Sequence, residues 1–159
     1  MGNGEISVYC GGGIGKTMMA IGKAVRSANS GKTVIMIQFL KGRSPEGVEV
    51  LARLEPEIRL FRFEKFEKHY EELSEEEKKE EARNIQNGVN FARKVMLTGE
   101  CDVLILDEIL RLMDEGLYTV EELLKLVQSK ADDMELVLTG RVLPDELKPY
   151  VNFISKIEA

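Results

Sequence analysis

A short glycine-rich segment that ends in a lysine and a threonine carries the clearest chemical signal in this sequence. Four of the five residues in Gly11–Gly15 are glycine, and Lys16 and Thr17 follow directly. In such a turn, at the start of a helix, backbone N–H groups converge on one place and favour an anion there. Lys16 adds a mobile cation, and the Thr17 hydroxyl is suited to ligate Mg²⁺. The segment therefore predicts a phosphate-binding loop.

The segment departs from the strict phosphate-loop pattern at one position. The pattern G-x-x-x-x-G-K-[ST] requires a glycine at position 10, where this chain has Cys10. A turn that merely links a strand to a helix would explain the glycines, but it would not explain the Lys16-Thr17 pair. We therefore favour the phosphate-binding interpretation.

A pair of carboxylates, Asp107 and Glu108, follows an apolar run about ninety residues downstream of Thr17. Mg²⁺ prefers hard oxygen ligands, and the carboxyl ends of parallel strands face the ligand site in open α/β sheets. The alternative is an acidic first turn that stabilises the next helix through its dipole. Together with the loop, the pair predicts that Thr17, Asp107 and Glu108 hold Mg²⁺ beside the phosphates.

These groups must be positioned by strands and helices that alternate along the chain. Apolar runs predict six strands, at Ile6–Cys10, Thr33–Phe39, Ile58–Phe63, Val103–Asp107, Glu135–Thr139 and Asn152–Ile157. The second, fourth and fifth are continuously apolar, which is typical of parallel strands buried on both faces.

Helical patterns lie between the strands. The first helix is expected from Met18 to Ala28. A capping box at Ser74 and Glu77 predicts a long helix, and the same motif at Thr119 opens a helix over Val120–Gln128. This order predicts an α/β protein with a three-layer P-loop NTPase-like fold and a mostly parallel central sheet of about six strands. At 159 residues we expect one nucleotide-binding domain over residues 1–159.

Composition limits the partners that we expect. The net charge is −6 and no stretch is basic, so a nucleic-acid partner is not expected. No apolar run approaches the ~20 residues that span a bilayer, and the first strand begins too early to follow a signal peptide. The two cysteines form neither a disulfide framework nor a metal-site pattern. We therefore expect a cytoplasmic protein without a membrane partner.

The segment Glu64–Arg83 is dense in charge, with nine acids and five bases. It fits a solvated loop and an exposed helix face, or a mobile lid over a second substrate. His69, the only histidine, lies in this segment. It is either an exposed loop residue or a general base.

With these features in view, the chain resembles the ATP:corrinoid adenosyltransferases that act on cobalamin and cobyrinic acid a,c-diamide. The resemblance covers nearly the whole chain and rests on four segments, Gly11–Thr17, Ile37–Gly42, Leu106–Glu108 and Leu138–Arg141. The second and fourth are not general P-loop features. The resemblance implies that the cobalt(I) of a reduced corrinoid attacks the ribose C5′ of ATP, and that triphosphate leaves.

The resemblance also implies roles for individual residues. It assigns the triphosphate to Gly11, Gly13, Gly15, Lys16 and Thr17, and it places Gly12, Ile14 and Met18 in the same nucleotide-binding site, with Lys16, Thr17 and Glu108 in catalysis. It assigns Mg²⁺ to Thr17, Asp107 and Glu108. Arg26 is expected near the nucleotide, and Gln38, Lys41 and Arg141 are expected at the rim of the site. A homodimer and a flavodoxin-like reductant are the implied partners besides ATP and the corrinoid.

The loop differs from the usual family loop at three side chains. An amide, a cation and a hydroxyl of the family are replaced here by Gly12, Ile14 and Met18. Loss of one fully made charge-assisted phosphate contact weakens binding by roughly 1.5–3 kcal/mol. The chain also lacks tryptophan, which many members carry in the loop that faces the corrinoid. Phe61, Phe63 or Phe66 could form that apolar wall, or they could pack the core beside the third strand.

Four functions compete on this sequence. An active adenosyltransferase explains all four matched segments, whereas a generic P-loop ATPase or kinase explains only the loop and the acidic pair. A nucleotide- or corrinoid-binding protein with impaired turnover is consistent with Ile14 and Met18. A purely structural module leaves Lys16 and Thr17 unexplained.

Overall fold

The computed structural model describes residues 4–40 and 49–158, so the predicted rim residue Lys41 lies outside the described residues. In chain order the elements are β1 (Ile6–Cys10), α1 (Lys16–Asn29), β2 (Val34–Gln38), η1 (Glu49–Leu54), β3 (Ile58–Arg62), η2 (Tyr70–Glu72), α2 (Glu75–Thr98), β4 (Val103–Asp107), α3 (Arg111–Asp114), α4 (Val120–Gln128), β5 (Glu135–Thr139), η3 (Asp145–Tyr150) and β6 (Phe153–Lys156). No described helix is both long and apolar enough to cross a membrane.

The six strands form one sheet in the order β3-β2-β4-β5-β1-β6, and every pair is parallel. This confirms the predicted α/β fold. Three strands have the predicted bounds, and the other three are shorter by one residue at one or both ends, where strand pairing stops. β5 lies between β4 and β1 in the sheet, so the end of β5 separates the acidic pair from the glycine loop.

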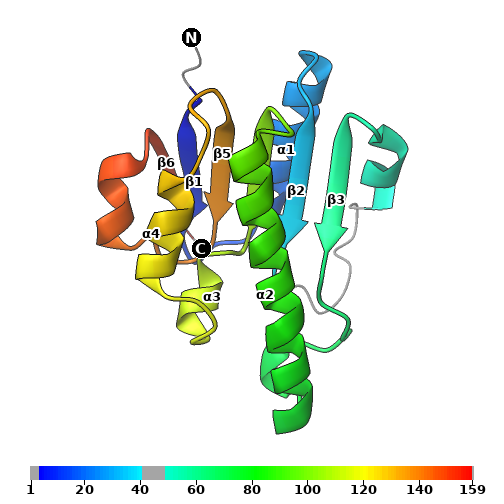
Figure 1. Cartoon of the computed structure of the whole chain (residues 1–159), viewed down its shortest axis with the longest axis vertical. Coiled ribbons are helices and arrows are strands. Elements are labelled where there is room, and N and C mark those ends of the chain that lie inside the picture. The colour runs from blue at the N-terminus through cyan, green and yellow to red at the C-terminus, as the bar shows by residue number, and fades with distance from the viewer. Residues whose placement is uncertain (1–3, 41–48, 159) are drawn as a thin grey trace.

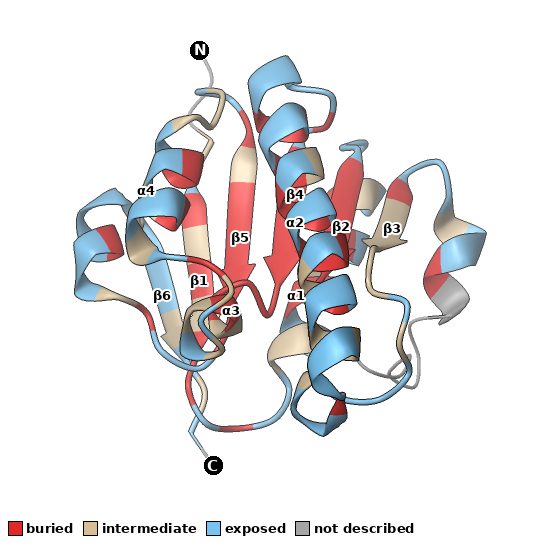
Figure 2. Ribbon diagram, turned by 60° about the horizontal axis from the view of Figure 1, so that its bottom comes forward, coloured by how far each residue is buried: buried red, intermediate tan, exposed pale blue. Residues whose placement is uncertain are grey.

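Helices cover both faces of the sheet (Figure 1). Alternate residues of β2 and β4 explain why, because successive side chains of a strand point to opposite faces. One set packs with α1 and contains Val34, Met36, Val103 and Ile105. The other set packs with α2 and α4 and contains Ile35, Ile37, Leu104 and Leu106. Figure 2 shows the result, with central strands buried between helices whose outer faces are exposed.

Both predicted capping boxes are present. Ser74 and Glu77 cap α2 reciprocally, and Thr119 and Glu122 do the same at α4. Helix α1 begins two residues earlier than predicted, because Gly15 at φ 108° serves as its N-cap. Helix α1 thus begins directly after the glycine loop, and the first turns of α2 form the second part of the charged segment Glu64–Arg83.

The charged segment is attached to the fold by two carboxyl groups. Glu64 accepts a hydrogen bond from the backbone N–H of Leu40, just after β2, at 2.5 Å. Glu81 of α2 is buried and accepts from the backbone N–H groups of Lys65 and Phe66, each at 3.0 Å. The start of the segment is therefore held in place by the protein interior, although its charged tip is exposed.

The Glu64 carboxyl group should make stability depend on pH. Burial, together with the neighbouring charge of Glu81, raises its pKa to about 7 against the opposing effects of the Leu40 N–H and nearby arginines. The folded chain therefore holds this proton more tightly than the unfolded chain, so this group's contribution to the free energy of unfolding falls as pH rises from about 4.5 to about 7. Glu64→Gln should remove that fall. The difference in free energy of unfolding between the variant and the parent should therefore shift in favour of the variant by at most about 3 kcal/mol from pH 5 to pH 8.

Urea denaturation of both proteins at the two pH values measures this difference. The exposed Glu67 offers a matched control, and Glu67→Gln should keep the parental pH dependence. If Glu64→Gln also keeps the parental pH dependence, the Glu64 carboxyl group does not titrate as described.

Candidate functional site

The glycine loop connects β1 to α1 and has the shape of an anion cradle. Gly11 must be glycine, since a Cβ there would lie 2.1 Å from the carbonyl oxygen of Ile157. At the other end of the loop, α1 has no side-chain cap and no acid in its first turn. The positive end of the α1 dipole therefore favours an anion at this end of the loop.

The ammonium group of Lys16 lies within this loop. Its Nζ donates to the carbonyl oxygens of Gly11 and Gly13, at 2.8 Å each. An ammonium group has three N–H donors. Lys16 thus stabilises the conformation of the loop, and its positive charge lies within the loop.

Asp107, at the end of β4, joins three elements beneath the loop. Its buried carboxyl oxygens accept hydrogen bonds from the Thr17 hydroxyl at 3.0 and 3.2 Å, from Gln38 Nε2 at 3.2 Å and from the Thr139 hydroxyl at 2.7 Å. The contact with Thr17 brings together two groups that lie 90 residues apart in the sequence. The loop and the acidic pair therefore belong to one site.

The end of β5 and the residues directly after it connect the acidic pair to the glycine loop. Thr139 accepts from the backbone N–H of Glu108 at 2.7 Å, while the Arg141 carbonyl oxygen accepts from the Gly11 N–H at 2.9 Å. Gly140 between them must be glycine, because a Cβ would lie 2.3 Å from Cβ of Leu110. This packing gives a physical reason for the Thr-Gly-Arg sequence.

Glu108 turns toward the loop in a left-handed backbone conformation, with φ 66°. Its carboxyl oxygen Oε2 lies 3.0 Å from Nη1 of Arg111, three residues further on in α3. Nη2 of the same guanidinium lies 3.3 Å from Oε1 of Glu71, in η2 of the charged segment. Arg111 was not among the residues that the sequence pointed to, although its i,i+3 spacing from Glu108 is a usable signal.

These elements enclose what we call the phosphate hollow, a cavity of about 320 Å³. It is lined by Gly12, Gly13, Ile14, Gly15, Lys16, Thr17, Met18, Glu108, Arg111 and Arg141. The structure thus brings most of the predicted site residues to one place. Ile14 is 96% exposed and Met18 is 58% exposed, so both present apolar surface at its mouth.

Two predicted positions differ from the structure. Arg26 lies in the last turn of α1, ten residues beyond Lys16 and thus about 15 Å along the helix axis, and it does not line the hollow. Gln38 was expected at the rim, but it is buried against Asp107 because it ends the central strand β2. The resemblance to the family indicated that Gln38 is near the site, but its burial depends on the position of β2 within the sheet, which the sequence does not show.

The three phenylalanines separate into two groups. Phe61 and Phe63 pack on Phe91 of α2, with ring centroids 4.7 and 5.6 Å apart. They are therefore core residues rather than a wall for a ligand. Phe66 instead lines a second cavity of about 670 Å³ in the charged segment.

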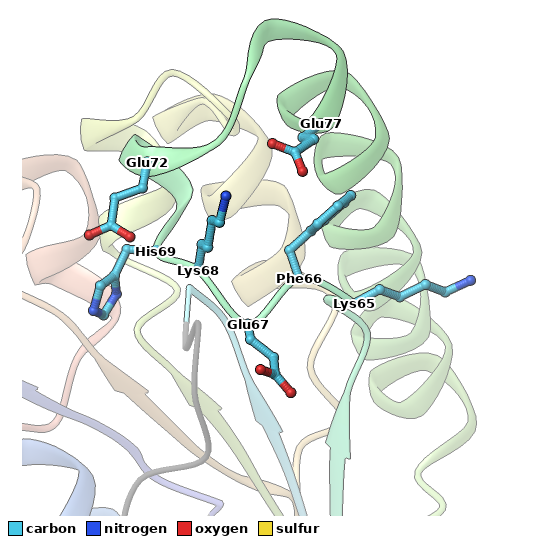
Figure 3. A pocket seen from close by; sticks show the side chains of 7 residues that line it. All are labelled: Lys65, Phe66, Glu67, Lys68, His69, Glu72 and Glu77. Atoms are coloured by element: carbon cyan, nitrogen blue, oxygen red, sulfur yellow. The ribbon is translucent and has the colours of Figure 1, made fainter.

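This second hollow is formed by Lys65, Phe66, Glu67, Lys68, His69, Glu72 and Glu77. Figure 3 shows Phe66 and Lys68 extending toward the side on which Glu77 lies, while Glu67 and His69 extend the other way. His69 is exposed, and no hydrogen bond fixes its ring among the described residues. The segment is thus a surface that could receive a ligand, next to the element that carries Glu71.

Comparison with known proteins agrees with this geometry. The family model described as ATP:corrinoid adenosyltransferase BtuR/CobO/CobP matches residues 2–159. An uncharacterized protein of Nostoc sp. (strain PCC 7120) is 30% identical over 98% of this chain and 44% of its own length. The corrinoid adenosyltransferase of Escherichia coli K12 is 25% identical, and corrinoid adenosyltransferase CobA of Salmonella typhimurium is 26% identical, each over 97% of this chain and 76% of the relative.

The chain therefore spans less than half the length of the Nostoc protein and about three quarters of the two enterobacterial enzymes. Because the family model matches almost every residue, the chain belongs to the ATP:corrinoid adenosyltransferase family BtuR/CobO/CobP.

Proposed function

We propose that this chain transfers the 5′-deoxyadenosyl group of ATP to the cobalt(I) of a corrinoid, either cobalamin or cobyrinic acid a,c-diamide. Cobalt attacks C5′, the cobalt–carbon bond forms, and the C5′–O bond breaks with its electron pair leaving on the triphosphate. The observation that carries this proposal is the hydrogen bond between Thr17 of the loop and Asp107, in a chain that matches the family over residues 2–159.

The loop would hold the triphosphate of ATP as a leaving group. Charge grows on the departing oxygen in the transition state, so donors that are already aimed there accelerate the reaction. The positive end of the α1 dipole and the ammonium group of Lys16 would stabilise that charge. The Lys16 bonds to Gly11 and Gly13 support this role, since they fix the ammonium group before ATP arrives.

The donor set near Thr17 suits Mg²⁺. Among the described residues no group of three or more acidic, histidine or cysteine side chains could hold a metal. In nucleotide sites Mg²⁺ takes one or two carboxylates and completes its shell with phosphate oxygens and water. Thr17 and Glu108 would hold the ion, with Asp107 orienting the Thr17 hydroxyl. When bound, Mg²⁺ would neutralise part of the phosphate charge.

The second hollow is our candidate for the corrinoid side of the site. Phe66 offers an apolar face, and Lys65 and Lys68 offer cations at its edge. Arg111 supports this assignment, because its two ion pairs connect Glu108 of the phosphate hollow to Glu71 of the charged segment. The reductant that supplies cobalt(I) and the homodimer remain predictions.

A second function is favoured by the exposed apolar side chains of Ile14 and Met18. A family member that binds ATP but transfers adenosyl slowly would have such a loop. Product analysis also separates the transferase from a generic ATPase, because adenosyl transfer releases triphosphate whereas hydrolysis releases ADP and phosphate.

We expect Lys16→Ala to raise the dissociation constant of ATP by about tenfold or more, since one charge-assisted contact is lost. Calorimetric titration in the presence of Mg²⁺ measures the change. Lys94→Ala, at an exposed position of α2, serves as the control and should bind like the parent. Equal ATP affinity in Lys16→Ala would rule out the phosphate-loop assignment.

Glu108→Gln should abolish the Mg²⁺ dependence of nucleotide binding while leaving the melting temperature nearly unchanged. The amide keeps the size of the side chain but is a poor ligand for a hard cation. Titrations with and without Mg²⁺ test this, with Glu121→Gln on the exposed face of α4 as the control. Parental Mg²⁺ dependence in Glu108→Gln would assign the ion to Asp107 or to another group.

Turnover should respond to the loop side chains more than binding does. We expect Ile14→Lys with Met18→Thr to raise the rate of adenosyl transfer by a larger factor than it tightens ATP binding, because the restored donors face charge that develops in the transition state. The assay follows adenosylcorrinoid formation by absorbance, from ATP and chemically reduced cobalamin, and quantifies released triphosphate.

A parent chain as fast as the double variant would mean that Ile14 and Met18 do not impair catalysis. If neither protein forms adenosylcorrinoid while both bind ATP, the binding function replaces the transferase.

A further inference from the structure

Arg111 faces the phosphate hollow but belongs to neither motif that defines it. It lines the hollow from α3, outside the glycine loop, and its side chain is 26% exposed. The loop itself contributes one cation, Lys16, and two of that ammonium group's donors are already directed at loop carbonyl oxygens. Ile14 and Met18 add no charge. Cations for a polyanion must therefore come from outside the loop.

Two arginines line the hollow, and they differ in how they are held. Arg141 is exposed, whereas Arg111 is held by two ion pairs, to Glu108 at 3.0 Å and to Glu71 at 3.3 Å. A guanidinium group has five N–H donors in a planar fork that matches phosphate oxygens. These two bonds use two of the five, so the group is oriented in advance with donors left for an anion.

The carboxyl partners of Arg111 are those that a nucleotide would displace. Glu108 is the proposed Mg²⁺ ligand, and an ion bound there would compete with the guanidinium for its oxygen. Glu71 is about half exposed, with a side-chain exposure of 52%, so its ion pair with Arg111 is weak and easily exchanged. A triphosphate in the hollow offers the guanidinium a more highly charged partner than either glutamate.

We propose that Arg111 is a triphosphate-binding residue, which exchanges its contacts with Glu108 and Glu71 for phosphate oxygens when ATP binds. This inference rests on the proposed function of the phosphate hollow. It gives the leaving triphosphate a cation from α3, in addition to the loop that lacks one at Ile14. It also makes nucleotide binding release Glu71, one residue from Glu72 of the second hollow.

The competing explanation is that Arg111 only clamps Glu108 to the charged segment. The two explanations differ in what Glu71 does. As a competitor for the guanidinium, Glu71 should oppose triphosphate binding. As the other half of a clamp, Glu71 should be needed for it.

The experiment titrates the full chain with ATP and with inorganic triphosphate, both with Mg²⁺, by calorimetry. Arg111→Gln should raise both dissociation constants by about tenfold or more, and Arg111→Lys should have an intermediate effect because it keeps the charge but loses the fork. Glu71→Gln should bind both probes as tightly as the parent or more tightly. Arg59→Gln, on β3 and paired with Glu100, is the matched control for loss of an arginine and should bind like the parent.

Three results would overturn the inference. Parental affinity in Arg111→Gln shows that the guanidinium does not bind phosphate. Weakening by Glu71→Gln as large as that by Arg111→Gln shows a clamp. A lowered melting temperature in Arg111→Gln with parental affinity in Arg111→Lys and in Glu71→Gln shows a role in stability alone.

Lys16→Ala in the same titration separates this inference from the proposed function. If Lys16→Ala weakens the binding of ATP and triphosphate and Arg111→Gln does not, the phosphate-loop assignment is supported and the proposed role of Arg111 is wrong. If the parent chain binds neither ATP nor triphosphate, both fall together.

Discussion

The site depends on one buried carboxyl group. Asp107 is fully buried and accepts hydrogen bonds from α1, β2 and β5 through Thr17, Gln38 and Thr139. A buried polar group that loses its partners destabilises the fold by roughly 1–3 kcal/mol, so each of these donors is held in place. The end of β4 thereby fixes the distance between the glycine loop and the acidic pair, which are separated by a strand of the sheet.

The neighbouring acids Asp107 and Glu108 have different positions in this arrangement. Asp107 points into the protein and is occupied by structural hydrogen bonds, whereas Glu108 turns out into the phosphate hollow through its left-handed backbone. The Thr139 hydroxyl serves both, since it donates to Asp107 and accepts from the N–H of Glu108. Two adjacent carboxyl groups thus have different surroundings, and of the two only Glu108 lines the hollow.

The altered side chains of the loop affect its chemistry more than its shape. The loop is shaped by its backbone, by the two carbonyl contacts of Lys16 and by the close approach of Gly11 to Ile157. None of these requires a particular side chain at positions 12, 14 or 18, and a Cβ at Gly12 would meet nothing within 4 Å. The shape of the loop therefore does not depend on the three side chains that differ from the usual family loop.

Local sequence patterns determined the strands, two helix starts and the glycine loop of this protein. Continuous apolar runs predicted the parallel strands, capping boxes predicted the starts of α2 and α4, and the glycine-lysine-threonine turn predicted the loop, because each depends on neighbours within a few residues. Tertiary structure alone decided the burial of Gln38, the distance of Arg26 from the hollow, the packing of Phe61 and Phe63 on Phe91, and the link from Glu108 through Arg111 to Glu71. These depend on strand order and helix packing, which bring together residues that the sequence keeps tens of positions apart.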